Sequence, residues 1–287
     1  MRRWLMRLFA VTICGASGCA STIDFVTGER FLSNPVEAVF TPAEEPMWVL
    51  ENAPEGDRRE KAFRDLEEPI HNGGDAAQQA KAVQWVRTGA TTDRRALVRL
   101  AAIEAAANFK DPQAADILVD AYRNAAFNAP PTTGSADVQP VAGLEKANEV
   151  ASFTPDTITT IRCRSLAGLG KIQSPKAREL LIEVAKQQQT NINPQQNLDS
   201  LSLARFNATV GTNETDHQTV RLAAIRSLGE YRNDPAAMQA LVEIMESERD
   251  VALRSRAHES LEMMSGQSFP ADPKPWKEWL NSKQGTR

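Results

Sequence analysis

A helix–turn–helix pattern that occurs several times along the chain limits the possible folds most strongly. Its clearest copy runs from Thr219 to Glu248, as TVRLAAIRSLGEYRNDPAAMQALVEIMESE. Apolar or small side chains four residues apart, at Val220, Ala224 and Leu228, predict a helix with one buried face. Pro235 then predicts the start of a second helix, because the missing N–H of proline costs nothing at the first helical position.

The same pattern can be aligned with other stretches of the sequence. Each first helix opens on an apolar residue followed by an arginine: Val98-Arg99, Ile161-Arg162, Val220-Arg221 and Leu253-Arg254. Four and eight residues after the apolar residue come Ala102 and Ala106, Ser165 and Leu169, Ala224 and Leu228, and Ala257 and Leu261. The turn proline recurs as Pro112, Pro175 and Pro235. A helix pair cannot bury its apolar face alone, so we expect the pairs to stack around a shared core.

This arrangement resembles the HEAT family, in particular the short HEAT-like repeats of phycobilisome lyase subunits. The resemblance rests on the apolar-Arg openings, on the small residue four positions later, and on the turns Asp111-Pro112 and Asp234-Pro235; the turn Ser174-Pro175 departs from the pattern. It covers about 81–283 and implies an all-α, HEAT-like α-solenoid of antiparallel helix pairs. It implies little about function, because such repeats serve as scaffolds in many settings.

The N-terminus predicts export. Residues 1–18 combine a basic start with a short apolar run that is too short to span a bilayer. Ala16-Ser17-Gly18-Cys19 resembles the bacterial lipobox, although Ala16 stands where leucine is usual. The resemblance implies that Cys19 is acylated and becomes the mature N-terminus, with ordinary secretion as the alternative. By resemblance to the enterobacterial sorting rule, Ala20 favours the outer membrane of a bacterial envelope over the inner membrane.

The rest of the chain divides into a tether and a repeat domain. Four prolines predict an extended tether over 19–56, within which the apolar patch Met47–Leu50 is expected to dock on the chain's own domain. The repeat domain is expected over 57–283. Its spacing between successive first helices predicts two inserts, at about 128–156 and 189–218, the first with a short helix over 142–150.

Both ends of the repeat domain are expected to be capped. Helices over 57–66 and 75–86, the second with Asp75 as its N-cap, would form a degenerate first repeat. At the other end, a helix that follows the first helix of the last repeat would place Trp276, Trp279 and Leu280 on one face. That face would cover the last open apolar surface.

Composition and motifs argue against several classes of function. The formal net charge of −4 is unlike the basic stripe that nucleic-acid binding needs. His71, His217 and His258 are scattered, and no cluster has the spacing of a metal site. Cys163 is expected to be a small buried side chain. We therefore predict a non-enzyme with no cofactor and no metal.

One set of side chains suggests a binding surface. Counted from the turn proline, the fourth and eighth residues of the second helices include five carboxylates: Asp116, Asp120, Glu179, Glu183 and Glu243. Residues four apart share a helix face, so these carboxylates predict an acidic stripe that receives a basic partner. A solvated polar face is the alternative. The repeated arginines are expected to be structural and to bond carbonyl groups or turn carboxylates of neighbouring repeats.

These observations together favour a membrane-anchored, non-catalytic scaffold that binds an unidentified protein. Two other interpretations stay open. One is an accessory or lyase-like subunit that holds a small ligand in the concave face, although the aromatic content of 6% is low for such a pocket. The other is a structural spacer in the envelope.

Overall fold

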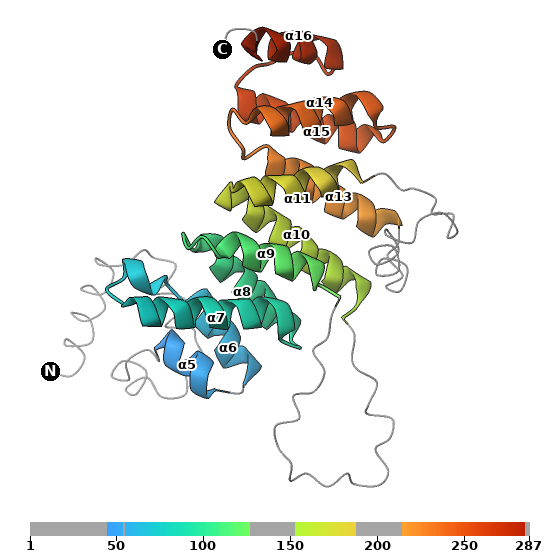
Figure 1. Cartoon of the computed structure of the whole chain (residues 1–287). Helices are drawn as coiled ribbons and strands as arrows, with labels where there is room; N and C mark the ends of the chain where they lie inside the picture. The colour runs from blue at the N-terminus through green and yellow to red at the C-terminus, as the bar shows by residue number, and fades with distance from the viewer. Residues whose placement is uncertain (1–44, 54, 127–152, 188–213, 285–287) are drawn as a thin grey trace, which may run out of the picture. The chain divides into compact units, whose positions relative to one another are not determined.

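The computed structural model describes residues 45–53, 55–126, 153–187 and 214–284, and all regular structure in these ranges is helical (Figure 1). The chain divides between Glu45 and Pro46, and the described helices belong to the second unit. The helices are α5 (Pro46–Asn52), α6 (Gly56–Arg64), α7 (Ala76–Thr92), α8 (Ala96–Asn108), α9 (Ala114–Arg123), α10 (Pro155–Ile172), α11 (Pro175–Lys186), α13 (Glu214–Leu228), α14 (Pro235–Ser247), α15 (Val251–Ser265) and α16 (Pro273–Gln284), with a short 3-10 turn η1 at Pro69–His71.

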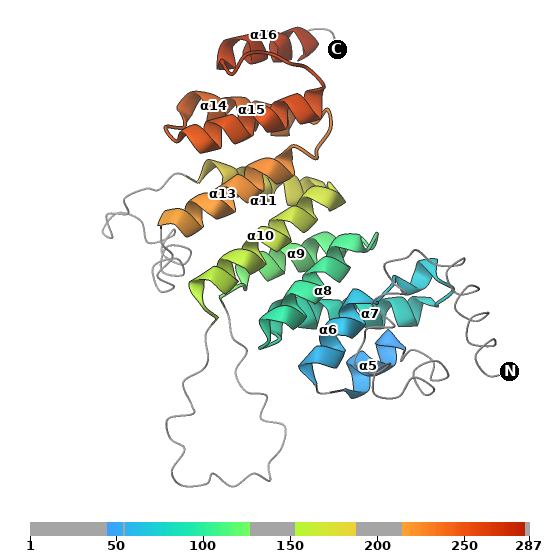
Figure 2. The same cartoon turned by 180° about the vertical axis from the view of Figure 1, so that it is seen from behind.

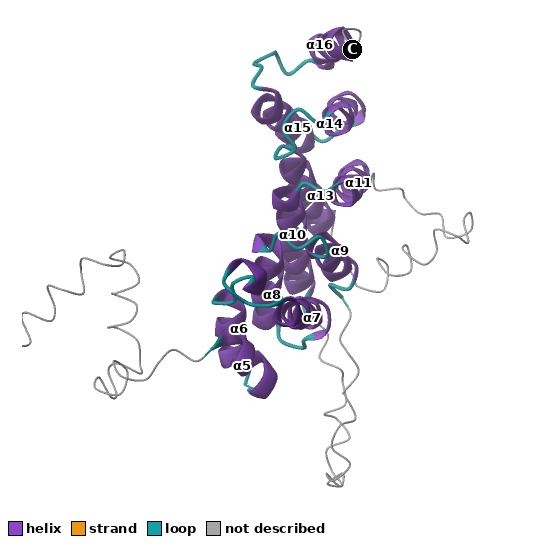
Figure 3. Cartoon of the chain, turned by 60° about the vertical axis from the view of Figure 1, so that its left-hand side comes forward, coloured by secondary structure: helices purple, strands orange, loops and turns teal. Residues whose placement is uncertain are grey.

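These helices form two layers, as Figure 3 shows. The first helices α6, α8, α10, α13 and α15 make one layer, in which each contacts the next. The second helices α7, α9, α11, α14 and α16 make the other layer in the same order. Helix α5 packs against α6. The predicted all-α stack of helix pairs is therefore confirmed.

The core lies between the layers and is built from the positions that the repeat predicts. All the apolar and small first-helix positions of the pattern are buried, from Val98 in the first copy to Leu261 in the last. The corresponding second-helix side chains are buried as well: Leu118, Ala121, Leu181, Val184, Leu241 and Ile244. Each repeat thus contributes an apolar face to a continuous core, which a single pair could not enclose.

Small residues let neighbouring first helices approach closely. A Cβ added to Gly170 in α10 would lie 3.0 Å from the Cβ of Ser227 in α13 and 3.1 Å from its carbonyl oxygen. Gly229, at the same position of the next repeat, would place a Cβ 3.2 Å from the Cβ of Ser260 in α15. The glycines near the first-helix ends therefore have a packing role, because any side chain there would push the layers apart.

Most of the second helices begin as the turn signals predict. Ser174 and Asp234 accept hydrogen bonds from the third helical residue, and Pro175 and Pro235 are the first residues of α11 and α14. The prediction for Pro112 is wrong, because α9 begins two residues later, at Ala114. The Asp111 carboxylate accepts a bond from the backbone N–H of Gln113, which makes an additional turn before the helix.

Several further boundaries differ from those expected, and α7, expected to end at residue 86, runs on to Thr92. Regular structure starts at α5, inside the predicted tether, and its Val49 and Leu50 are buried, so docking of the apolar patch is confirmed. Helices α10 and α13 begin at Pro155 and Glu214, inside the predicted inserts. Their first turns are polar, so the apolar pattern underestimates their length. The predicted helix over 142–150 lies outside the described residues.

Both ends of the stack are closed by helices. At the N-terminal end the helices are α5, α6 and α7, and Asp75 is the N-cap residue of α7 as predicted, in a capping box with Gln78. At the other end, Trp276 and Leu280 of α16 are buried, and the indole N–H of Trp276 donates to the carbonyl of Pro270 over 3.2 Å. None of the helices in the described ranges is long and apolar enough to cross a membrane.

Candidate functional site

Ion pairs join neighbouring second helices across the whole stack. We call the exposed faces of α7, α9, α11, α14 and α16 the second-helix surface. The pairs on it are Arg87 with Asp120 (2.6 Å), Lys176 with Asp116, Lys186 with Glu243 (2.5 Å) and Lys277 with Glu246 (2.6 Å). Each pair joins one helix to the next. Opposite charges therefore alternate along this surface instead of forming a uniform acidic stripe.

The five predicted carboxylates thus fall into two groups. Asp116, Asp120 and Glu243 are half-exposed, and each pairs with a cation of a neighbouring helix. Glu179 and Glu183, one turn apart on α11, are exposed and form no ion pair with any residue that the structure describes. Of the five predicted carboxylates, the two that form no such pair therefore both lie on α11.

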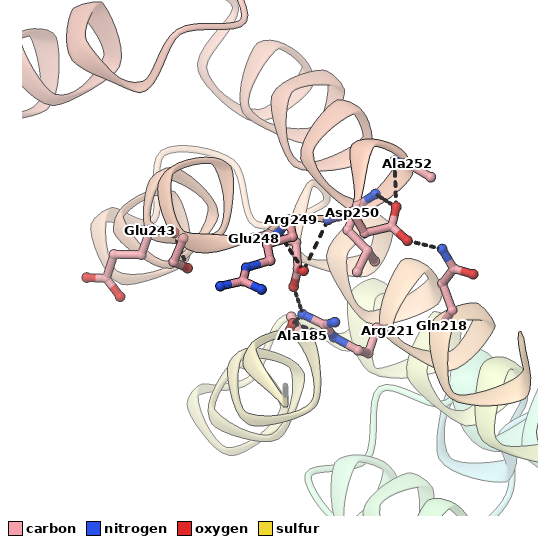
Figure 4. Close-up of polar contacts among 10 residues, drawn as sticks. Ala185, Gln218, Arg221, Glu243, Glu248, Arg249, Asp250 and Ala252 are labelled. Atoms are coloured by element: carbon pink, nitrogen blue, oxygen red, sulfur yellow. Dashed lines mark hydrogen bonds and ion pairs between the residues drawn. The ribbon is translucent and has the colours of Figure 1, made fainter. Parts of the chain in front are cut away.

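A polar hollow of about 210 Å³ lies between the C-terminal end of α11 and α14. Arg221 forms its floor: the guanidinium donates to the carbonyl of Ala185 over 3.1 Å and pairs with Glu248 (Figure 4). Lys186 and Glu243 line the same hollow. Every one of these charges has a partner of opposite sign, so the hollow presents a fixed polar surface without a net excess of one charge.

The carboxylates of this hollow are ionised at neutral pH. The hydrogen bond from Lys186, assisted by one from Gln239, lowers the pKa of Glu243. Burial by itself would raise the pKa of Glu248, but the bonds from Arg221 and from two backbone N–H groups outweigh it, and the pKa is lowered. A partner therefore meets these side chains as carboxylates.

The repeated arginines were expected to be structural, and two of the four, Arg99 and Arg221, donate to backbone carbonyls at the ends of second helices. Arg99 is fully buried and donates to the carbonyls of Asp93 (2.7 Å) and Asn124 (3.0 Å). Burial lowers its pKa to about 10, so it stays charged at neutral pH. Arg162 lies over the ring of Tyr122, 5.8 Å from its centroid. Arg254, in the last repeat, is exposed.

Cys163 and His217 lie near these arginines and are unsuited to nucleophilic or acid chemistry at neutral pH. Cys163 is half-buried rather than fully buried, and burial raises the pKa of its thiol to about 11. Burial, with the charges of Arg221 and Arg162, lowers the pKa of His217, so its imidazole is neutral at pH 7. No group of His, Cys, Asp or Glu in the described ranges could hold a metal ion.

Sequence reasoning missed the basic half of the second-helix surface. Arg87, Lys176 and Lys186 sit on second helices, but only the carboxylates recur in register. Whether a basic side chain lies opposite an acidic one on the next helix depends on how the two helices are offset. The repeat pattern does not give this offset. The predicted lipid attachment residue Cys19 lies outside the described residues.

Comparisons with known proteins agree with this architecture. The family model described as PBS lyase HEAT-like repeat matches residues 161–187, which cover most of α10 and all of α11. The fold is a HEAT-like α-solenoid. No curated protein matches the sequence. The matched segment contains the apolar-Arg opening Ile161-Arg162 and the turn Ser174-Pro175, so the HEAT-like solenoid is a repeat scaffold. The matched repeat also carries Glu179 and Glu183.

Proposed function

We propose that this HEAT-like solenoid is a lipid-anchored, non-catalytic scaffold of a bacterial envelope that binds a protein partner through its second-helix surface. The observation that carries the proposal is the contrast among the recurring carboxylates. Asp116, Asp120 and Glu243 already neutralise cations of neighbouring helices, whereas Glu179 and Glu183 on α11 have no such partner among the residues that the structure describes. A partner with two basic side chains about one helical turn apart would complement them.

The surrounding surface supports a protein rather than a small ligand as the partner. The polar hollow beside α11 is open and made of paired charges, and ion pairs join α11 to the second helix on either side. Ligand pockets are mostly apolar and enclosed. A polar surface that extends over several repeats is instead typical of solenoids that bind other proteins.

The test of partner binding uses charge reversal at the two unpaired carboxylates. Immobilised full-length protein carrying Glu179→Lys and Glu183→Lys would be compared with wild type in capture from detergent-solubilised envelopes, followed by quantitative mass spectrometry. We expect the proteins captured by wild type to fall at least about tenfold, since each lost ion pair at a desolvated contact weakens binding by about 1 kcal/mol or more. The control variant, Glu67→Lys with Glu230→Lys, makes the same change in charge at two exposed positions that are not part of α11. Equal capture by both variants would refute the proposal.

The anchor is tested separately. Lipid attachment at Cys19 predicts an intact mass that exceeds the mass of the cleaved polypeptide by that of the acyl groups, and partitioning into the detergent phase. Cys19→Ser should lose both properties, because the thiol is the acceptor of the lipid. An unmodified wild-type mass would leave a secreted binding scaffold and remove the membrane from the proposal.

A further inference from the structure

A groove on the other layer of the molecule is not explained by the proposed function. It lies between the first helices α8 and α10, which are neighbours in Figure 2, and has a volume of about 230 Å³. The wall from α8 carries Leu97, Leu100, Glu104 and Ala107, and the wall from α10 carries Arg164, Ala167, Gly168 and Lys171. Arg64 of α6 also lines it. We call it the α8–α10 groove.

The wall from α8 is mostly apolar, with Glu104 as its one charged side chain. Leu97 is 58% exposed although it belongs to a helix with a largely buried surface. The wall from Leu97 to Ala107 extends about 15 Å along α8, at 1.5 Å per residue. Gly168, on the opposite wall, lets α10 lie close to α8, since an added Cβ would come within 3.0 Å of the Ala107 Cβ. The groove is thus shaped to receive side chains from about three turns of a helix.

Three cations outnumber the single carboxylate, Glu104, among the residues that line the groove. Arg164 and Lys171 are exposed, and neither forms an ion pair within the described ranges. Arg64 pairs only within its own helix, with Glu60 over 2.5 Å, and its side chain stays 62% exposed. These cations differ from Lys176 and Lys186 of the second-helix surface, which are already neutralised by Asp116 and Glu243.

We infer that the α8–α10 groove binds an acidic amphipathic helix of a partner protein. Apolar side chains on one face of that helix would pack between Leu97 and Ala167, as in other helix-in-groove complexes. Carboxylates two turns apart would face Arg164 and Lys171, which are themselves two turns apart on α10. The proposed function places a basic partner on the other layer, so the two surfaces select ligands of opposite charge and can be occupied together.

The experiment uses two fluorescein-labelled helical peptides of about three turns. Both have the same leucine-rich face, and one has two glutamates seven positions apart where the other has two lysines. Binding to the full-length protein is followed by fluorescence anisotropy. We expect saturable binding of the glutamate peptide, at least about tenfold tighter than that of the lysine peptide, and weakened by added salt.

Variants then assign the binding to this groove. Arg164→Glu with Lys171→Glu should reverse the preference between the two peptides, and Ala167→Trp should abolish binding of both by filling the exposed groove. Arg226→Glu with Arg254→Glu makes the same change in charge at exposed positions of α13 and α15 and should leave affinity within about twofold. Circular dichroism of each variant checks that its helices are intact.

Three results would overturn the inference. They are the absence of saturable binding by the glutamate peptide, a preference of wild type for the lysine peptide, and equal losses in the groove and control variants. Sedimentation of the protein alone could give a fourth result of this kind. A dimer that Ala167→Trp dissociates would show that a second copy of this chain occupies the groove.

Discussion

The same residue at the same position of the repeat has different roles in different repeats. The arginine after the first apolar residue is fully buried at Arg99, is buried and paired with Glu248 at Arg221, and is exposed at Arg254. Of these three, Arg99 and Arg221 each lie beside the end of a second helix and donate hydrogen bonds to its carbonyl groups. The stabilising value of this arginine therefore depends on its neighbours and not on the motif itself.

Replacing Arg99 with methionine tests this difference. Arg99→Met keeps the apolar stem but leaves the buried carbonyls of Asp93 and Asn124 without their donors. We expect the free energy of unfolding to fall by about 2–4 kcal/mol. Arg254→Met, at the same repeat position, should change it by less than about 0.5 kcal/mol because the side chain is exposed. Urea unfolding followed by circular dichroism measures both, and similar losses would contradict the explanation.

Cys163 provides a second residue-scale prediction, based on its raised pKa. In the folded protein the thiol has a pKa of about 11, whereas an unfolded cysteine titrates near about 8.5. Folding therefore favours the neutral thiol; this contribution to stability is complete below about pH 8.5 and is lost as the pH rises through 11. At pH 9 we expect iodoacetamide to alkylate Cys163 at least about fivefold more slowly in the folded chain than in urea. Peptide mass spectrometry gives the rate at this residue, and equal rates would refute the raised pKa.

At the scale of helices, the contact between α10 and α13 depends on the absence of a side chain. Gly170 faces the backbone of Ser227, and the next first helix repeats the arrangement with Gly229 and Ser260. Glycine lowers the intrinsic stability of a helix. The cost is offset here because close approach lets the flanking apolar side chains of both helices pack at high density.

A valine at this position should separate the two helices. Gly170→Val would place its Cβ 3.0 Å from the Cβ of Ser227, with further atoms beyond, so we expect a loss of about 1–3 kcal/mol in the free energy of unfolding. Lys171→Val introduces the same β-branched residue at the adjacent exposed position and should cost about 0.5 kcal/mol or less. Urea unfolding gives the midpoint of each variant. Equal midpoints for Gly170→Val and Lys171→Val would exclude a packing role for Gly170.

The sequence predicted the helix pairs well because each depends on local signals. Repeated apolar positions gave the buried faces, and Ser174 and Asp234 gave the starts of α11 and α14. Where a local signal competed with a contact from elsewhere, prediction failed. Asp111 also accepts a hydrogen bond from Gln79, 32 residues away, and the turn that results delays α9 past Pro112. The ion pairs of the second-helix surface were not predictable either, since they depend on the offset between separate helices.

At the scale of the whole molecule, each helix pair is stabilised mainly by the pairs on either side. Interactions in a solenoid are between neighbours, so disturbances at one end should weaken with distance along the stack. The terminal helix α16 contacts α14, and its Trp276 ring packs edge-on against Phe269, with 5.0 Å between the ring centroids. This helix closes the core at the C-terminal end and should be the point at which local unfolding begins.

Replacing the buried Trp276 tests whether α16 closes the core and whether a disturbance weakens with distance along the stack. Trp276→Ala should increase hydrogen exchange throughout α16 and in α14 and α15, because the core beneath it becomes open to water. Exchange in α8 and α10 should be unchanged. Trp48→Ala, at a side chain that is 51% exposed, should leave all of these helices protected. Uniform loss of protection along the chain after Trp276→Ala would show that the stack unfolds as one cooperative unit instead.

The ion pairs between second helices also have a mechanical consequence. The first-helix layer is joined by backbones in direct contact, which resist extension because separation would open voids. The second-helix layer is joined at its surface by long, half-exposed side chains such as Lys186 and Glu243, whose attraction salt screens. One side of the stack is therefore stiff and the other compliant. When the stack bends, the first-helix layer should act as the hinge and the second helices should move apart. Bending should become easier as ionic strength rises.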